Sequence, residues 1–258
     1  MAKVTKLEQS KDKLTIRFAA EGESVAYVNT LRRAVMDYVP TLAVEDLEIR
    51  KNSSVLYDEI IAHRIGLLPI TTEPGSYTFR VEGETGLGSE LKLTLSVKGP
   101  GYVYAEELKS KDSKAKPAQP KMIIGKLLKG QEIELEATAI LGRGIEHAKW
   151  APGQIYYEYN SEVKVNNKAK ELDQFITKFP PQVVDNGKIS KEKIIKLELM
   201  DACEGVCPEV VDVQYNSDSL KVTVESWGQM PAKLMVKEGC KYIAEALDDF
   251  ADAVKALK

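Results

Sequence analysis

Five side chains in this sequence are histidines or cysteines, the residue types that most often bind zinc and iron. They are His63, His147, Cys203, Cys207 and Cys240. Zinc and iron–sulfur sites need about three or four converging thiolate or imidazole ligands. Only Cys203 and Cys207 lie close together in the sequence, and their C-x₃-C spacing is wider than the usual C-x₂-C pair. We therefore predict no bound iron or zinc, with the two cysteines either free or joined in a short disulfide.

The sequence contains no recognisable catalytic pattern. Neither histidine has a nucleophile or a metal ligand at a characteristic spacing. The motifs of phosphate loops, serine hydrolases and zinc proteases (G-x-x-x-x-G-K-[ST], G-x-S-x-G and H-E-x-x-H) do not occur. Asp248 and Asp249 fall on the polar face of a predicted helix, where they would be solvated. The isolated chain is therefore predicted to catalyse no reaction, and both histidines are expected to be structural or interface residues.

The composition is that of an ordinary globular protein: of 258 residues, 43% are hydrophobic and 29% are charged. The formal net charge of −3 provides no basic field for a nucleic acid. No apolar run reaches the roughly 18 residues of a membrane span, and the N-terminus lacks the apolar core of a signal peptide. We therefore expect a cytoplasmic protein that binds no membrane and makes no direct contact with nucleic acid.

The order of predicted strands and helices is typical of an α+β fold. Leu14, Ile16 and Phe18 alternate with polar residues, which predicts a strand hairpin near the N-terminus. Further strands are predicted over 42–50, 90–100, 131–141, 153–159 and 218–228. Helices are predicted over 24–39, within 54–70, after the Asn186-Gly187 turn and after Pro231.

Two of these helices have more apolar surface than one chain needs. The helix over 24–39 is apolar around about 180°, whereas a surface helix needs a stripe only a little wider than about 100°. This helix is either enclosed by its own chain or packs one flank against another subunit. The helix after Pro231 has apolar residues spaced alternately four and three apart, as in a coiled coil. This seam consists of Val236, Cys240, Ile243, Leu247, Phe250, Val254 and Leu257. Together the two helices favour a dimer interface.

Three long segments of this chain form recognisable motifs. The first is NTLRRAVMDYVPTLAVEDLEIRKNSSVLYDEIIAHRIGLLPI (29–70). The second is LLKGQEIELEATAILGRGIEHAKWAPGQIYYEY (127–159). The third is VTVESWGQMPAKLMVKEGCKYIAEAL near the C-terminus. These segments resemble signatures of the α-like subunits of cellular RNA polymerases, specifically the archaeal D subunit and the third-largest subunit of eukaryotic polymerase II, and the resemblance covers nearly the whole chain.

The resemblance implies a discontinuous dimerisation domain, with an antiparallel sheet and two long helices, interrupted by a β-rich domain and a small ferredoxin-like insert. The expected boundaries are 1–45, 150–165 and 214–258 for the dimerisation domain, 46–149 for the β-rich domain and 166–213 for the insert. It also implies a non-catalytic scaffold of DNA-directed RNA polymerase, a nucleotidyltransferase. The chain would pair with a small α-like subunit, called L in archaea. The pair, together with small platform subunits, would then support the second-largest, catalytic subunit.

The resemblance also implies roles for individual residues. The dimer interface would comprise the seam together with Val28, Leu31, Val35 and Tyr38. Contacts to the second-largest subunit would involve Asn29, Arg32, Arg33, His147, Lys149 and Trp150. Arg33 falls on the polar face of its helix. Arg32 falls inside the apolar arc, where a charge needs a partner, so it is expected either to bond a carboxylate or carbonyls or to reach solvent as a surface arginine.

Many archaeal members of this family hold an iron–sulfur cluster in the insert, and the eukaryotic homologues bind zinc after GLLPI. This sequence departs from both patterns: the insert contains only Cys203 and Cys207, and residues 71–90 contain no cysteine. We therefore expect a ferredoxin-like insert without a cluster, held by its own core. The expected core is Val183, Val184, Ile189, Ile194, Ile195, Leu197, Leu199, Val206 and Val210.

Two other functions remain open. One is a ferredoxin-like redox or electron-transfer protein, for which the sequence supplies too few cluster ligands. The other is a scaffold that pairs with itself, as bacterial α does, and gel filtration without a partner would distinguish it.

Overall fold

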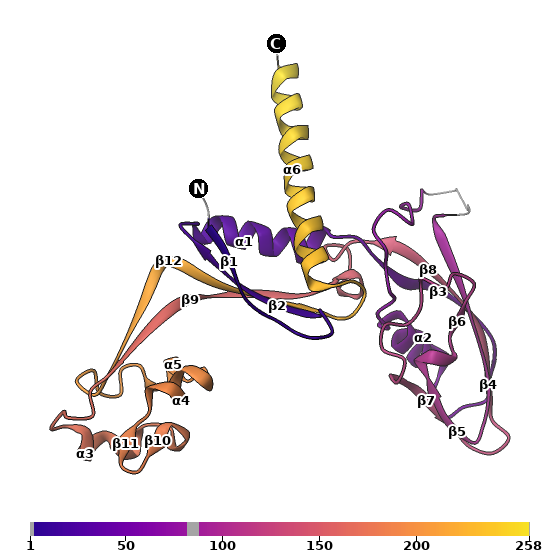
Figure 1. Ribbon diagram of the computed structural model, residues 1–258. Helices are drawn as coiled ribbons and strands as arrows, with labels where there is room; N and C mark the ends of the chain where they lie inside the picture. Colours follow the sequence, from indigo (N-terminus) through magenta and orange to yellow (C-terminus); the bar gives the residue numbers. More distant parts are fainter. Residues whose placement is uncertain (1–2, 82–87, 258) are drawn as a thin grey trace. The chain divides into compact units, whose positions relative to one another are not determined.

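The computed structural model describes residues 3–81 and 88–257 (Figure 1). It confirms an α+β protein with antiparallel sheets. The chain divides into two compact units, one made mostly of residues 157–222 and the other mostly of residues 25–156 and 223–257. Among the described residues, no helix is both long and apolar enough to cross a membrane.

One four-stranded sheet joins strands that are distant in the sequence, in the order β1-β2-β12-β9. The predicted N-terminal hairpin is present, and its turn is held by the Ser10 hydroxyl, which accepts a hydrogen bond of 2.9 Å from the Thr15 amide. Strands β1 and β2 form that hairpin, whereas β9 continues six residues beyond the predicted 153–159 and β12 begins seven residues before the predicted 218–228. The strands are β1 (Lys3–Gln9), β2 (Thr15–Glu21), β9 (Gly153–Val165) and β12 (Val211–Ser226).

The helix predicted over 24–39 is regular for only part of its length. Helix α1 spans Val25–Arg33, and the chain then continues as a π-helical segment, η1, over Ala34–Tyr38. A π-helical turn has i→i+5 hydrogen bonds, so residues after 33 do not keep the angular positions that a wheel of 100° per residue gives them. Val35 is completely buried at the start of this segment.

Helix α6 (Ala232–Ala256) packs against η1 through its N-terminal half. Gly239 permits a close approach there: a Cβ atom at this position would lie 2.6 Å from Val35 Cγ2 and 3.3 Å from the Val35 amide nitrogen. One turn further on, the rings of Tyr242 and Tyr38 stack with their centroids 4.3 Å apart. The close glycine contact and the stacked rings fix α6 to η1.

A second four-stranded sheet, in the order β3-β8-β4-β6, contains the largest apolar core. In its register Leu42 pairs with Leu141, and Leu93 pairs with Ala137. Helix α2 (Asp58–Gly66) buries Ile61 and Ile65 and follows the predicted bounds of that helix. The strands of this region are β3 (Thr41–Asn52), β4 (Glu90–Lys98), β6 (Lys109–Ser110) and β8 (Glu132–Gly142), with a separate pair β5 (Gly101–Tyr104) and β7 (Ile123–Leu127).

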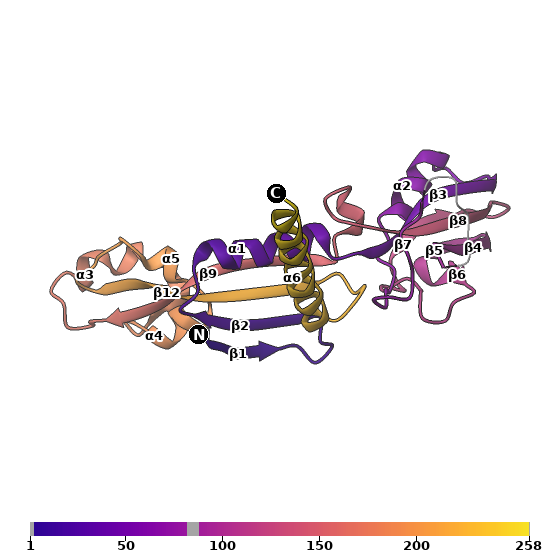
Figure 2. The same ribbon diagram turned by 90° about the horizontal axis from the view of Figure 1, so that it is seen from above.

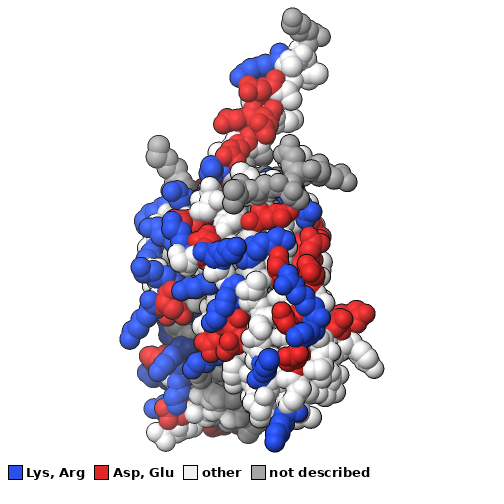
Figure 3. All heavy atoms as spheres, turned by 90° about the vertical axis from the view of Figure 1, so that its right-hand side faces the viewer, with Lys and Arg blue, Asp and Glu red and all other residues white. Residues whose placement is uncertain are grey.

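The charged side chains of this second sheet form ion pairs between neighbouring strands. Arg50 on β3 and Lys92 on β4 both pair with Glu136 on β8, at 3.3 and 3.6 Å. Figure 3 shows one face of the molecule, on which positive and negative side chains are interspersed. Opposite charges in such pairs partly cancel each other.

The segment between β9 and β12 folds around its own small core. The predicted Asn186-Gly187 turn is present, with positive φ angles of 48° and 74°, and joins β10 (Val184–Asp185) to β11 (Lys188–Ile189). The Ser190 hydroxyl caps the following helix by accepting a hydrogen bond from the Lys193 amide. The short helices are α3 (Leu172–Phe175), α4 (Lys191–Lys196) and α5 (Met200–Cys203).

The core predicted for this segment is correct for most residues but wrong for two. Val183, Ile194 and Val210 are buried as expected. Ile195 and Leu197 are instead 51% and 48% exposed. Helix α4 has only six residues, and Ile194 occupies its one buried face. The neighbouring side chains of Ile195 and Leu197 therefore point outward. The core also includes the side chains of both cysteines of this segment.

Candidate functional site

The C-terminal half of α6 exposes large apolar side chains. Leu247, Phe250, Val254 and Leu257 are between 48% and 80% exposed. Figures 1 and 2 both show the N-terminal half of α6 against the end of α1, while its C-terminal half extends away from them. Apolar surface of this kind in a well-formed helix usually marks an interface.

The two halves of α6 have different apolar faces. The residues of α6 that are buried inside the chain are Ala232, Met235 and Gly239, and the last two each come one position before a residue at the start of the seam. Of those seam residues, Val236 and Ile243 are half-buried and Cys240 is exposed. The helix thus packs on its own chain through one face and leaves the adjacent, predicted seam available over its whole second half.

The residues of α1 and η1 that the sequence assigned to the dimer interface are mostly buried within the free chain. Val28, Leu31 and Val35 are at most 7% exposed, so the chain itself already buries them. Tyr38 is half-buried and stacks on Tyr242. The wide apolar arc is thus covered within the chain, which is one of the two alternatives that the sequence left open, partly by α6, which packs on η1. The assignment of these residues to the dimer interface stays a prediction.

The two adjacent arginines differ in their surroundings. Arg32 is half-buried; its Nε donates a hydrogen bond of 2.9 Å to the side-chain carbonyl oxygen of Asn29, and it also contacts the Met36 sulfur. Among the described residues, the partners of Arg32 are therefore a carbonyl and a thioether rather than a carboxylate. Arg33 is 59% exposed and lies 3.6 Å from Asp37, one turn further on. Arg33 is thus the arginine that is accessible to another molecule.

Asp37 connects Arg33 to the loop that precedes β9. The Asp37 carbonyl accepts a hydrogen bond of 2.9 Å from the Ile145 amide. In this loop His147 is exposed, and its Nδ1 accepts a hydrogen bond from the Lys149 amide at the start of a short 3-10 helix, η3 (Ala148–Trp150). The Lys149 ammonium binds the Val44 carbonyl at 3.0 Å and forms an ion pair with Glu45.

Trp150, which was assigned to the contact with the second-largest subunit, is only 6% exposed. Its indole Nε1 donates to the Ile140 carbonyl at 3.3 Å, and its own carbonyl accepts from the Thr41 hydroxyl at 2.6 Å. A Cβ atom at Gly142 would overlap the indole ring. These contacts make Trp150 a buried support of the loop in the free chain, and its contact with the second-largest subunit stays a prediction.

The two histidines, which are far apart in the sequence, line one cavity of about 330 Å³. Glu45 and Lys149 line the same cavity. Sequence reasoning placed His63 and His147 in separate motifs, and only the folded position of α2 beside β3 and the loop before β9 brings them together. Across residues 3–81 and 88–257, no group of three or more His, Cys, Asp or Glu side chains is arranged to hold a metal ion.

Cys203 and Cys207 are free thiols in the structure, 0% and 3% exposed. Burial raises the pKa of both thiols, which favours the uncharged form. The Cys207 thiol also donates to a Glu209 carboxylate oxygen at 3.3 Å, and this contact raises its pKa further. These sulfur atoms pack as small apolar groups in the core of their segment.

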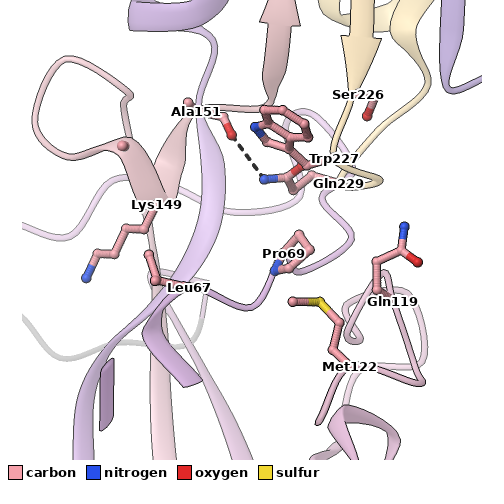
Figure 4. Close-up of a pocket in the computed structure, with 10 residues that line it drawn as sticks. Leu67, Pro69, Gln119, Met122, Lys149, Ala151, Ser226, Trp227 and Gln229 are labelled. Atoms are coloured by element: carbon pink, nitrogen blue, oxygen red, sulfur yellow. Dashed lines mark hydrogen bonds between the residues drawn. The ribbon is translucent and has the colours of Figure 1, made fainter. Parts of the chain in front are cut away.

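A second cavity, of about 410 Å³, was not anticipated from the sequence (Figure 4). It lies among the loop after α2, the loop before β7, η3 and the loop between β12 and α6. The exposed Trp227 in SWGQMP is the signal that could have indicated it. Its lining residues are Leu67, Pro69, Gln119, Met122, Ala148, Lys149, Ala151, Ser226, Trp227 and Gln229.

Comparison with known proteins gives concordant matches. Residues 42–155 match a family model described as the RNA polymerase Rpb3/RpoA insert domain. A DNA-directed RNA polymerase subunit Rpo3 from Pyrococcus horikoshii is 33% identical over 100% of this chain and 99% of its own length. The Rpo3 of Thermococcus kodakarensis is 33% identical over 97% of each chain. That of Methanosarcina acetivorans is 35% identical over 88% of this chain and 89% of its own.

Proposed function

This chain belongs to the Rpo3 family of archaeal DNA-directed RNA polymerase subunits, and we propose that it acts in that enzyme as a non-catalytic assembly scaffold. It pairs in the cytoplasm with a small α-like subunit, L. The pair and the small platform subunits then support the second-largest, catalytic subunit, and the chain itself makes no direct contact with nucleic acid. The observation that carries this proposal is the exposed seam on the second half of α6.

The seam supports pairing on physical grounds. Its last four residues are exposed although α6 remains a regular helix as far as Ala256. A helix partner with the same alternating spacing would bury these side chains in coiled-coil fashion. A stable interface buries on the order of 1,000 Å² or more in total, and we propose that the exposed seam of α6 forms one part of it.

Arg33 supports the second contact, to the catalytic subunit. Its ion pair with Asp37 is long and exposed, and such pairs contribute little to stability, about 0–1 kcal/mol. We therefore expect Arg33→Ala to leave both the fold and pairing with L unchanged. Capture of the second-largest subunit should weaken, by roughly 2–5 kcal/mol if the guanidinium is desolvated in that interface.

A competitive pull-down with the second-largest subunit measures this effect. Arg50→Ala is the matched control, because Arg50 is 53% exposed and also forms surface ion pairs, but lies on β3. Equal recovery of the Arg33→Ala and wild-type chains in competition would refute the assignment of Arg33 to the catalytic-subunit contact.

We also propose that the chain carries no iron–sulfur cluster and no zinc. The insert, which we propose to be ferredoxin-like, provides two thiols, both buried in its core with raised pKa values. Elemental analysis after anaerobic purification should find neither metal in stoichiometric amount. About three or four irons per chain, with a brown chromophore, would contradict this prediction and favour a redox function.

A further inference from the structure

One charged side chain in the loop before β9 has no counter-ion in the free chain. Arg143 is half-buried, and among residues 3–81 and 88–257 its guanidinium has neither an ion-pair partner nor a hydrogen-bond acceptor. Its Nε is shut off from solvent, whereas the two terminal nitrogens, Nη1 and Nη2, still reach it. A charge that is partly removed from water is costly unless it is paired. The terminal nitrogens can therefore donate to an acceptor that a partner supplies.

The position of Arg143 is fixed by its neighbours. Its guanidinium carbon lies 4.8 Å from the centroid of the Phe79 ring, at the distance of a cation–π contact. The next residue is Gly144, where a Cβ atom would overlap the Met36 carbonyl oxygen, so the loop lies directly against η1. The ring and the loop thus hold the guanidinium in place without neutralising it.

Tyr242 lies near Arg143 but cannot serve as its counter-ion. Burial raises the pKa of the Tyr242 phenol, and the Arg143 charge acts in the opposite direction. The balance is a raised pKa, so the phenol is uncharged at neutral pH. The Tyr242 ring stacks on Tyr38, which is also uncharged at this pH. This side of the guanidinium therefore faces aromatic rings and no carboxylate among them.

Exposed apolar side chains accompany this charge. Phe79, in contact with the guanidinium, is 40% exposed, and Ile145, two residues further along the loop, is 56% exposed. We call Arg143, Phe79 and Ile145 the Arg143 patch. Arginine and aromatic residues are enriched at protein interfaces, and arginine is among the residues that contribute most to binding. The patch thus has the composition of a protein-binding surface.

Asp37 connects the patch to Arg33, the residue that we assign to the contact with the catalytic subunit. The Asp37 carboxylate lies 3.6 Å from Arg33, and its backbone carbonyl accepts a hydrogen bond of 2.9 Å from the Ile145 amide. Exposed His147 follows two residues after Ile145. A subunit that contacts both Arg33 and His147 would therefore also meet the patch.

We propose that the Arg143 patch binds an acidic segment of the second-largest, catalytic subunit. A carboxylate of that segment accepts hydrogen bonds from Nη1 and Nη2 of Arg143, the usual geometry of a bidentate arginine–carboxylate pair. An apolar side chain next to the carboxylate packs on Ile145. This proposal rests on the proposed scaffold function and adds to it a further contact residue and the chemistry of its partner.

Arg143→Met tests the role of the charge. Methionine removes the charge but keeps a long side chain that can pack on the Phe79 ring. In a competitive pull-down of the chain paired with L, capture of the second-largest subunit should fall at least tenfold, while pairing with L is unchanged. The unfolding temperature of the free chain should stay the same or rise, because the variant no longer holds an unpaired charge away from water.

Arg50→Met is the matched control. Arg50 is 53% exposed and already paired with Glu48 and Glu136, so its loss should change capture less than twofold. A purely structural role of Arg143 would lower the unfolding temperature and the capture of the second-largest subunit together, and that result would overturn the proposal.

Photo-cross-linking identifies the partner residue. The full chain with p-benzoyl-phenylalanine in place of Ile145 is paired with L, mixed with the second-largest subunit and irradiated. We expect a cross-link to a segment of that subunit that contains Asp or Glu. Replacing this acidic residue by Ala should weaken capture at least tenfold, and combining it with Arg143→Met should weaken capture little further, because both changes remove the same pair.

The outcomes separate the proposal from the scaffold function. Capture of the Arg143→Met chain within twofold of wild type, a cross-link to L alone, or losses that multiply in the double variant would overturn the proposal and leave the scaffold function intact. Failure of the wild-type pair to capture the second-largest subunit would overturn the scaffold function, and this proposal with it.

Discussion

Phe250→Asp should abolish pairing with the small α-like subunit while leaving the fold of the free chain unchanged. Phe250 is 68% exposed in the free chain, so its loss removes little internal packing. In the proposed pair the same position lies on the seam between two helices. A carboxylate buried there without a partner costs several kcal/mol, which corresponds to a loss of affinity of at least a hundredfold. Leu247→Asp should act in the same way.

A titration of the labelled chain with L measures the effect. Asp249→Lys is the matched control, because it changes a charge beside Phe250 but lies off the seam. Circular dichroism of each free variant shows whether α6 is still formed. If Asp249→Lys weakened pairing as much as Phe250→Asp, the helical phase of the seam would be wrong.

Trp150→Ala should produce the largest loss of stability of any exchange discussed, about 3–5 kcal/mol, which is typical of removing a buried aromatic side chain. The indole fills the space beside Gly142 and donates to the Ile140 carbonyl, so its removal leaves a cavity and removes that hydrogen bond. Thermal unfolding of the free chain measures the change.

The second tryptophan of the chain provides the control for this prediction. Trp227 is 45% exposed, and Trp227→Ala should change the unfolding temperature much less than Trp150→Ala does. The outcome that would contradict the structural role is a Trp150→Ala chain of unchanged stability that no longer captures the second-largest subunit. Trp150 would then be a partner contact after all.

Periodic patterns predicted the regular elements well. The alternation in 131–141 corresponds to β8, and the Asn186-Gly187 turn has the two positive φ angles that such turns require. The spacing in α6 identified the residues that remain exposed beyond the contact with η1. These features depend on residues close together in the sequence, which is why the sequence reveals them.

The features that the sequence did not reveal are contacts between distant segments. The wide apolar arc of α1 and η1 suggested a partner, but α6 covers part of it. The sequence around Gly239 does not indicate that α6 packs closely against Val35 at this position. Trp150 was assigned by its position in a motif, although contacts to β3 and β8 bury it. His63 and His147 meet at one cavity only because α2 and the loop before β9 both pack beside β3. No local pattern encodes such contacts.

The most direct test of the scaffold function is the native mass of the complex that forms when this chain of 28.6 kDa is co-expressed with the small α-like subunit. The scaffold function predicts a single species that contains one copy of each chain. The same species should form when the two separately purified chains are mixed. A self-paired species of about 57 kDa, twice the mass of the chain, that excludes the small subunit would contradict this function and indicate a scaffold of the bacterial type.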